Sequence, residues 1–221
     1  MTVLTVNDLT ARVATAARAA GSGRRFLLGI TGPPGAGKSR LAASLATALT
    51  ATGHPAGVAG MDGFHLTGTV LRATGALDHK GRPDTFDVAA FVRRSEMLRD
   101  SASRVPWPVY DRELHDPVPD AMVFDEHRIA IVEGNYLLLD RPGWSEVRAH
   151  MDAVWYLDAD DALIERRLLR RHRRGGKPPD RARAMVFGND LPNARLIAQT
   201  RARAELVLVA TTGGYLIRAA R

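Results

Sequence analysis

Short apolar runs alternate along the chain with longer stretches in which apolar residues recur at helical spacing. The short runs predict buried strands, and the longer stretches predict helices. We predict strands at residues 26–31, 56–61, 128–134, 153–157, 205–209 and 215–218. We predict helices at residues 8–20, 40–53, 88–100, 161–174 and 181–204, the last interrupted near 188–192. This alternation predicts an α/β fold with three layers (α/β/α) around a mainly parallel sheet of five strands.

Local signals define several ends of these elements. Asn7 is expected to cap the first helix, and Gly21 to end it. Asp158 and Asp160 are expected to cap the helix at 161–174, which two glycines end. The two last apolar runs are expected to meet as short strands across the turn at 213–214.

The pattern is weaker between residues 67 and 100. Residues 80–87 are polar and turn-like, and Asp87 is expected to cap the helix that follows. Residues 105–117 contain three prolines, which exclude a central strand. Aromatic, acidic, basic and imidazole side chains in one irregular segment fit a binding loop. A surface loop anchored in the core by Trp107 is the alternative.

Residues 32–39, with the sequence GPPGAGKS, lie between a predicted strand and a predicted helix. Glycines allow consecutive backbone N–H groups to converge on a phosphate, and the helix directs its positive end to the same point. Lys38 adds a positive charge for the β and γ phosphates, and the Ser39 hydroxyl can bind Mg²⁺. An ordinary turn is the alternative, but the flanking elements favour a phosphate-binding loop (P-loop). Its candidate nucleotide-binding residues are Gly32, Pro33, Pro34, Gly35, Ala36, Gly37, Lys38, Ser39 and Arg40.

Two acids follow predicted strands. Asp62 comes directly after the second strand, where ligands of open α/β sheets bind. It suits a general base for an acceptor hydroxyl, although Asp-Gly is also a common turn pair, and the residues alone leave both readings open. Glu133 ends a buried strand and could hold the water shell of Mg²⁺.

The net charge of +7 is concentrated in an arginine-rich stretch at residues 166–183. Such a stretch could bind nucleic acid, form a solvated helix face, or form a lid over a triphosphate. It lacks the aromatic residues of a single-strand stacking platform. Behind a phosphate-binding loop we favour the lid, at about residues 160–180, and we expect no nucleic-acid partner.

Composition sets further bounds. The 221 residues suit a single domain, residues 1–221, with acceptor-binding segments at about 62–120. Cysteine is absent, which excludes disulfides and thiolate metal sites. No apolar run is long enough to span a membrane, and the N-terminus lacks the pattern of a signal peptide, so a cytoplasmic location is the expectation.

Several segments together resemble the kinases related to uridine kinase, bacterial pantothenate kinase and phosphoribulokinase, including compact bacterial nucleoside kinase-like and fructose transport system kinase-like members. The matching segments are GPPGAGKS at 32–39, MDGFH at 61–65, KGRPDTFD at 80–87, PVYDRELHD at 108–116, VEGNYLLL at 132–139, and the arginine-rich helix after WYLD at 155–158. The resemblance implies a P-loop fold and ATP-dependent, Mg²⁺-dependent transfer of phosphate to a small-molecule hydroxyl. A nucleoside, a sugar or a pantothenate-like compound is the expected acceptor. The alternatives are a P-loop NTPase switch and a regulatory protein without kinase activity.

The resemblance also implies roles for individual residues. Asp62 is the expected catalytic base, with Lys38, Arg166 and Arg170 as further catalytic residues, and Ser39 with Glu133 as metal ligands. The expected acceptor contacts are Asp62, His65, Asp84, Tyr110, His115 and Asn189, with Asn193 as the alternative to Asn189. Relatives of this kind commonly form dimers, so a homodimer is compatible with the resemblance.

Overall fold

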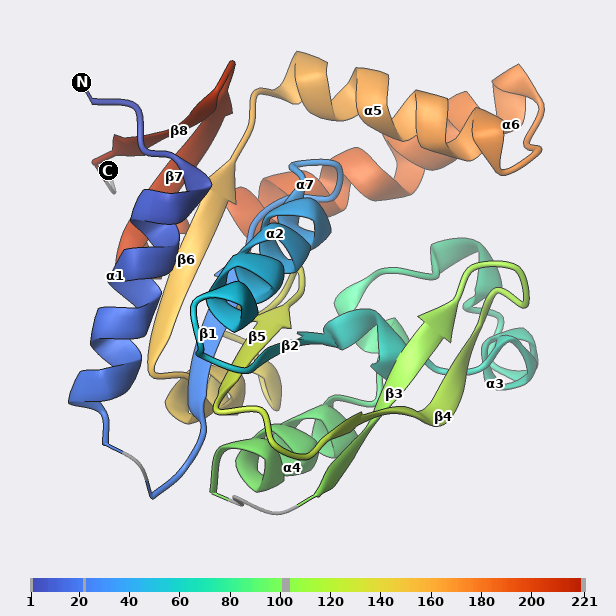
Figure 1. Cartoon of the computed structure of the whole chain (residues 1–221). Coiled ribbons are helices and arrows are strands. Elements are labelled where there is room, and N and C mark those ends of the chain that lie inside the picture. Colours follow the sequence, from blue (N-terminus) through green and yellow to red (C-terminus); the bar gives the residue numbers. More distant parts are fainter. Residues whose placement is uncertain (1, 22, 101–103, 220–221) are drawn as a thin grey trace.

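The computed structural model describes residues 2–21, 23–100 and 104–219 (Figure 1). Its centre is a six-stranded sheet in the order β2-β5-β1-β6-β7-β8. All neighbouring strands are parallel except β8, which pairs antiparallel with β7. The mainly parallel sheet is confirmed, but it has six strands rather than five, because β8 adds an antiparallel strand at the edge beside β7. The strands are β1 (Phe26–Thr31), β2 (Ala56–Gly60), β5 (Ile129–Glu133), β6 (Ala153–Asp158), β7 (Leu206–Thr211) and β8 (Gly214–Arg218).

Helices cover both faces of the sheet, which confirms the three layers (Figure 1). Side chains alternate along a strand, so β1 contributes to two separate cores. Leu28 and Ile30 pack with α1 (Val6–Ala19) and α2 (Lys38–Ala51). Leu27 packs in the opposite core, to which α4 (Val88–Asp100) and α7 (Leu191–Ala198) also contribute.

Two helix boundaries differ from the predictions. Thr5 rather than Asn7 caps α1, because Thr5 and Asp8 form a reciprocal capping box that starts the helix at Val6. The predicted final helix is divided into α6 (Pro179–Met185), a π-helical segment (Val186–Asp190) and α7. The arginine-rich helix α5 (Asp161–Arg174) has the predicted cap, Asp160, which accepts a hydrogen bond from the Leu163 N–H at 2.7 Å.

Residues 105–117 are not an irregular loop. They form β3 (Val105–Asp111) and the start of β4 (Asp116–Phe124), a two-stranded antiparallel sheet apart from the central one. The prolines are tolerated because both strands are edge strands, and the pairing shifts between Trp107 and Val109. Trp107 is fully buried, and its indole N–H donates to the Gly60 carbonyl at 3.0 Å, so it anchors this hairpin against the end of β2. The short helix α3 (Gly68–Ala73) lies between β2 and the hairpin in the chain.

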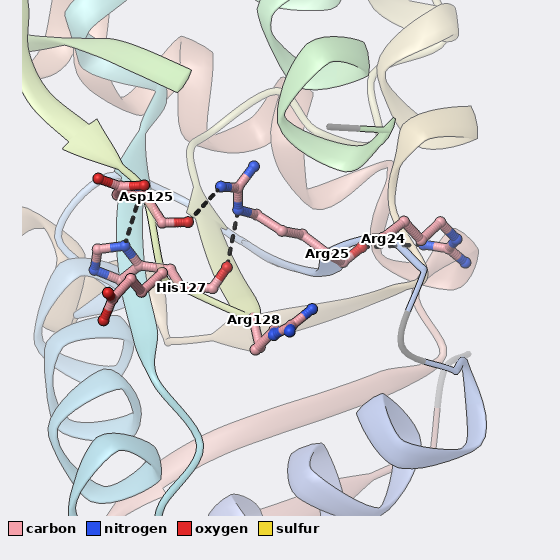
Figure 2. Close-up of a pocket in the computed structure, with 6 residues that line it drawn as sticks. Arg24, Arg25, Asp125, His127 and Arg128 are labelled. Atoms are coloured by element: carbon pink, nitrogen blue, oxygen red, sulfur yellow. Dashed lines mark hydrogen bonds between the residues drawn. The ribbon is translucent and has the colours of Figure 1, made fainter. Parts of the chain in front are cut away.

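A cavity of about 370 Å³ lies at the end of the sheet where β1 and β5 begin (Figure 2). Arg25 is buried beside it, and its guanidinium donates to the carbonyls of Asp125 and His127 at 2.9 Å each, and to those of Leu98 and Phe124 at 3.4 Å each. The arginine therefore joins the ends of α4 and β4 to the start of β1.

Arg25→Met should lower the free energy of unfolding by about 2–4 kcal/mol, because it takes this donor away from four carbonyls, two of which form buried hydrogen bonds with it. Urea unfolding measures this. Arg12→Met, at an exposed position of α1, is the control and should change stability by less than about 0.5 kcal/mol. A change for Arg25→Met as small as that of the control would show that the buried arginine does not stabilise the fold.

Candidate active site

The P-loop, residues 32–39, connects β1 to α2. Gly32, Gly35 and Gly37 have φ values of 140°, 80° and 110°, which side chains disfavour. A Cβ at Gly32 would overlap the Leu157 carbonyl oxygen. Gly37 precedes α2 without a side-chain cap, so the first N–H groups of this helix are available to an anion. The loop therefore has the backbone conformation and the helix end that phosphate binding requires.

Lys38 points into the site from the first turn of α2. Its side chain is held by the Pro33 carbonyl at 3.0 Å and by Asn135 Oδ1 at 2.7 Å, and the residue is 7% exposed. Burial lowers the pKa of Lys38 to about 8, while the carboxylates of Glu133 and Asp62 oppose the shift. A bound polyphosphate would offer this ammonium stronger partners than a carbonyl and an amide. Asn135, which sequence reasoning missed, follows the strand-ending acid by two positions.

Ser39 and Glu133 lie side by side. The Ser39 hydroxyl donates to Glu133 Oε1 at 3.0 Å, and burial raises the pKa of Glu133, with Asp62 adding to the shift. A hydroxyl and a carboxylate are hard oxygen ligands of the kind Mg²⁺ accepts while it keeps several waters or phosphate oxygens. Within residues 2–21, 23–100 and 104–219, no group of three or more metal-binding side chains occurs. The pair fits a magnesium ion shared with a nucleotide rather than one held by the protein alone.

Asp62 lies in the 3₁₀ turn Met61–Phe64, which follows β2, the strand that pairs with the Glu133 strand β5. Its side chain is 41% exposed, and its nearest ionic partner is Arg112 Nη2, 4.0 Å from Oδ2. Its charge acts on the pKa of Lys38, Glu133 and His65, so the four groups share one site. The structure thus brings together the four predicted residues Lys38, Ser39, Asp62 and Glu133.

Aromatic rings form one wall beside Asp62. The His65 ring lies 4.0 Å from the Phe86 ring and 5.0 Å from the Tyr110 ring. Its Nδ1 donates to the Asp62 carbonyl at 2.8 Å, and burial lowers the pKa of His65, which favours the neutral imidazole. The Tyr110 hydroxyl donates to the His115 carbonyl at 2.8 Å, so the main chain of His115 shapes this wall while its imidazole is exposed.

Asp84 and the two asparagines, Asn189 and Asn193, are the remaining predicted acceptor contacts. Asp84 is exposed in the 3₁₀ turn Pro83–Thr85. Asn189 Nδ2 donates to the Lys80 carbonyl at 3.0 Å, and Asn193 Nδ2 donates to the Gly81 carbonyl at 3.4 Å. Both asparagines have protein partners in residues 80–82, and an acceptor contact by either stays a prediction.

Helix α5, which contains most of the predicted lid, packs on the P-loop. Arg167 Nη1 donates to the carbonyls of Gly35 and Ala36 at 2.8 and 2.9 Å. A Cβ at Gly35 would lie 3.6 Å from the Arg167 Cβ, so the helix and the loop are in close contact. Arg166 and Arg170, the predicted catalytic arginines, are exposed on α5. Arg167 was missed because helical spacing shows which arginines share a face but not which one meets the loop.

Residues 27–180 match the phosphoribulokinase/uridine kinase family, which is more than half of the chain. The chain belongs to this family. The protein YggC of Escherichia coli is 33% identical over 193 residues, which cover 86% of this chain and 80% of YggC. A pantothenate kinase of Mesorhizobium japonicum is 30% identical over 215 residues, covering 83% of this chain and 67% of that enzyme. A crystal structure from Silicibacter sp. TM1040, described as a "putative fructose transport system kinase", superposes with a TM-score of 0.85 at 40% identity and covers 92% of this chain and 98% of that one.

Membership confirms the resemblance, the fold class and the expectation of an ATP-dependent kinase acting on hydroxyl groups. It does not distinguish one acceptor from another, because kinases with different acceptors share the family. Among the described residues, no helix combines the length and the apolar character needed to cross a membrane.

Arg167→Ala should weaken ATP binding by roughly tenfold or more, because hydrogen bonds from a charged donor contribute about 1.5–3 kcal/mol and these two fix the P-loop. We expect Arg166 and Arg170 to act on the transferred phosphoryl group. Arg166→Ala and Arg170→Ala should therefore change ATP affinity less than Arg167→Ala does, and should slow phosphoryl transfer instead. Calorimetric titration with ATP and turnover assays separate the two effects. Unchanged ATP affinity and unchanged turnover in all three variants would show that these arginines form only a solvent-exposed helix face.

Proposed function

We propose that this protein transfers the γ-phosphate of ATP to a hydroxyl group of a small polyhydroxylated or pantothenate-like molecule. The observation behind this proposal is the position of Asp62. It follows β2, whose end lies opposite Glu133, its charge acts on the pKa of Lys38, Glu133 and His65, and its side chain is 41% exposed. A group at the boundary between a nucleotide site and a second site suits a general base.

The roles of the chain's own residues follow from this placement. Lys38 and the backbone amides of the P-loop bind the β and γ phosphates, and Ser39 and Glu133 hold Mg²⁺. The magnesium ion neutralises charge on the phosphate oxygens when it is bound. Asp62 takes the proton of the acceptor hydroxyl as the acceptor oxygen bonds to the γ-phosphorus and the bond to the β–γ bridging oxygen breaks. Arg166 and Arg170 stabilise the charge on the transferred group, and α5 excludes water that would otherwise hydrolyse ATP.

The acceptor class rests on the side chains next to Asp62. Tyr110 and His65 offer aromatic faces and polar groups, which suit a nucleoside or a sugar, while Lys80 and Arg112 add positive charge that would favour an acceptor with a carboxylate. Relatives named pantothenate kinase and the neighbour described as a fructose transport system kinase are consistent with either chemistry.

A screen of ADP formation against nucleosides, sugars, glycerate and pantothenate tests the proposal. We expect ADP formation that depends on one chemical class and requires Mg²⁺. ADP formation at the same rate with every acceptor, and without any, would favour the alternative of an NTPase switch.

A further inference from the structure

The π-helical segment Val186–Asp190 interrupts the C-terminal helices between α6 and α7. Such segments are rare and often occur at functional sites. Asn189 and Asp190 are both buried here, although Phe187 beside them is 45% exposed. These two neighbouring polar residues contact two different parts of the molecule.

Asn189 contacts residues 80–82, which we call the 80–82 turn. Its Oδ1 accepts from Arg82 Nε at 3.0 Å, and its Nδ2 donates to the Lys80 carbonyl at 3.0 Å. Arg82 Nη2 also donates to the Gly188 carbonyl at 3.4 Å. The π-helical segment therefore holds the turn through both its backbone and a side chain.

The 80–82 turn reaches the acceptor side of the site. The Lys80 ammonium donates to the His115 carbonyl at 2.6 Å, lies 3.3 Å from Asp116, and lies 4.9 Å from the centre of the Tyr110 ring. The Gly81 carbonyl accepts from the Tyr136 hydroxyl at 2.6 Å. Movement of this turn would change the wall that Tyr110 forms beside Asp62.

Asp190 contacts the lid. Its Oδ2 is 2.7 Å from His172 Nε2, and both residues are about nine-tenths buried. His172 lies in the last turn of α5, the same helix that binds the P-loop carbonyls through Arg167. A continuous set of contacts thus runs from the P-loop along α5 to Asp190, and from Asn189 to the 80–82 turn.

We propose that Asn189 and Asp190 are positioning residues that transmit the position of α5 to the 80–82 turn, so that nucleotide binding orders the acceptor site. A buried, hydrogen-bonded contact changes between discrete arrangements rather than stretching, so a shift of α5 requires the π-helical segment to move with it. The inference rests on the proposed function only in taking the 80–82 turn as part of the acceptor site.

Hydrogen exchange with and without Mg²⁺ and the non-hydrolysable analogue AMP-PNP tests this without an acceptor. In the unmodified protein, the analogue should slow exchange at residues 32–39 and also at residues 80–86. In Asp190→Ala and His172→Ala, the slowing at 32–39 should remain and the slowing at 80–86 should be lost. The double variant should lose no more than either single variant, because both remove the same contact.

Two further variants separate positioning from folding. Arg82→Met removes two of the three contacts between the π-helical segment and the turn at a partly exposed position, and should reduce the slowing at 80–86 even if the buried variants fail to fold. His172→Gln keeps a donor toward Asp190 and should restore part of the response. Arg173→Ala, on the exposed side of α5 next to His172, is the matched control and should behave as the unmodified protein.

Equal slowing at 80–86 in the unmodified protein and in Arg82→Met would overturn the proposal. So would slowing confined to residues 32–39 in the unmodified protein. Failure of the acceptor screen with an intact exchange response would instead contradict the proposed function and leave the coupling established.

Discussion

Lys38→Met abolishes phosphoryl transfer, with an expected loss of roughly 1,000-fold or more, the scale of a positive charge that acts on the transferred phosphoryl group. Methionine keeps much of the length of the side chain but removes the ammonium that donates to the Pro33 carbonyl and to Asn135 Oδ1. Turnover measured as ADP release at saturating ATP and acceptor gives this effect.

The same substitution should not unfold the protein. Burial lowers the pKa of Lys38 to about 8, which means that the folded environment disfavours its charge. Removing that charge relieves a desolvation cost and offsets the two lost hydrogen bonds, so the thermal unfolding midpoint should stay close to the original. Arg12→Met, exposed on α1, is the control for losing a positive charge and should keep full turnover. Near-normal turnover in Lys38→Met would refute phosphate binding by this loop.

Asp62→Asn is expected to slow transfer by roughly 100-fold or more, the usual contribution of a positioned general base. Asparagine keeps the shape of the side chain and cannot accept the proton. Because Asp62 repels the phosphates rather than binding them, ATP affinity should be retained or should rise. Calorimetry for binding and a single-turnover experiment for transfer measure the two quantities.

Glu96→Gln, exposed on α4, is the matched loss of a carboxylate and should leave both quantities unchanged. If Asp62→Asn transfers phosphate at the rate of this control, the general base must be another residue. Loss of ATP binding in Asp62→Asn together with loss of transfer would indicate a role in the nucleotide site instead.

The P-loop could be predicted because its conformation depends on neighbouring residues, glycines at fixed spacing between a strand and a helix. The proximity of Asp62 and Glu133 could be predicted as well, because Asp62 follows one strand, Glu133 ends another, and parallel strands end at the same edge of a sheet. β2 and β5 are indeed neighbours, with Gly60 opposite Glu133.

Features that depend on contacts between distant segments could not be predicted. The prolines excluded a central strand at 105–117, and an irregular loop was expected, but an isolated two-stranded sheet has only edge strands and accepts prolines. Helical spacing placed several arginines on one face of α5, but the rotation of that helix against the P-loop selects Arg167. The partners of Asn189 and Asp190 follow from a π-helical turn, for which the sequence shows only an interruption near Gly188 and Pro192.

The most direct test of the account is phosphorus NMR of a reaction containing ATP, Mg²⁺ and the best acceptor from the screen. We predict a new phosphoester signal that grows in equal amount with ADP, and whose growth is slowed roughly 1,000-fold or more in Lys38→Met and roughly 100-fold or more in Asp62→Asn. Inorganic phosphate in equal amount with ADP, and no phosphoester, would contradict the claim that this site transfers phosphate to a hydroxyl acceptor.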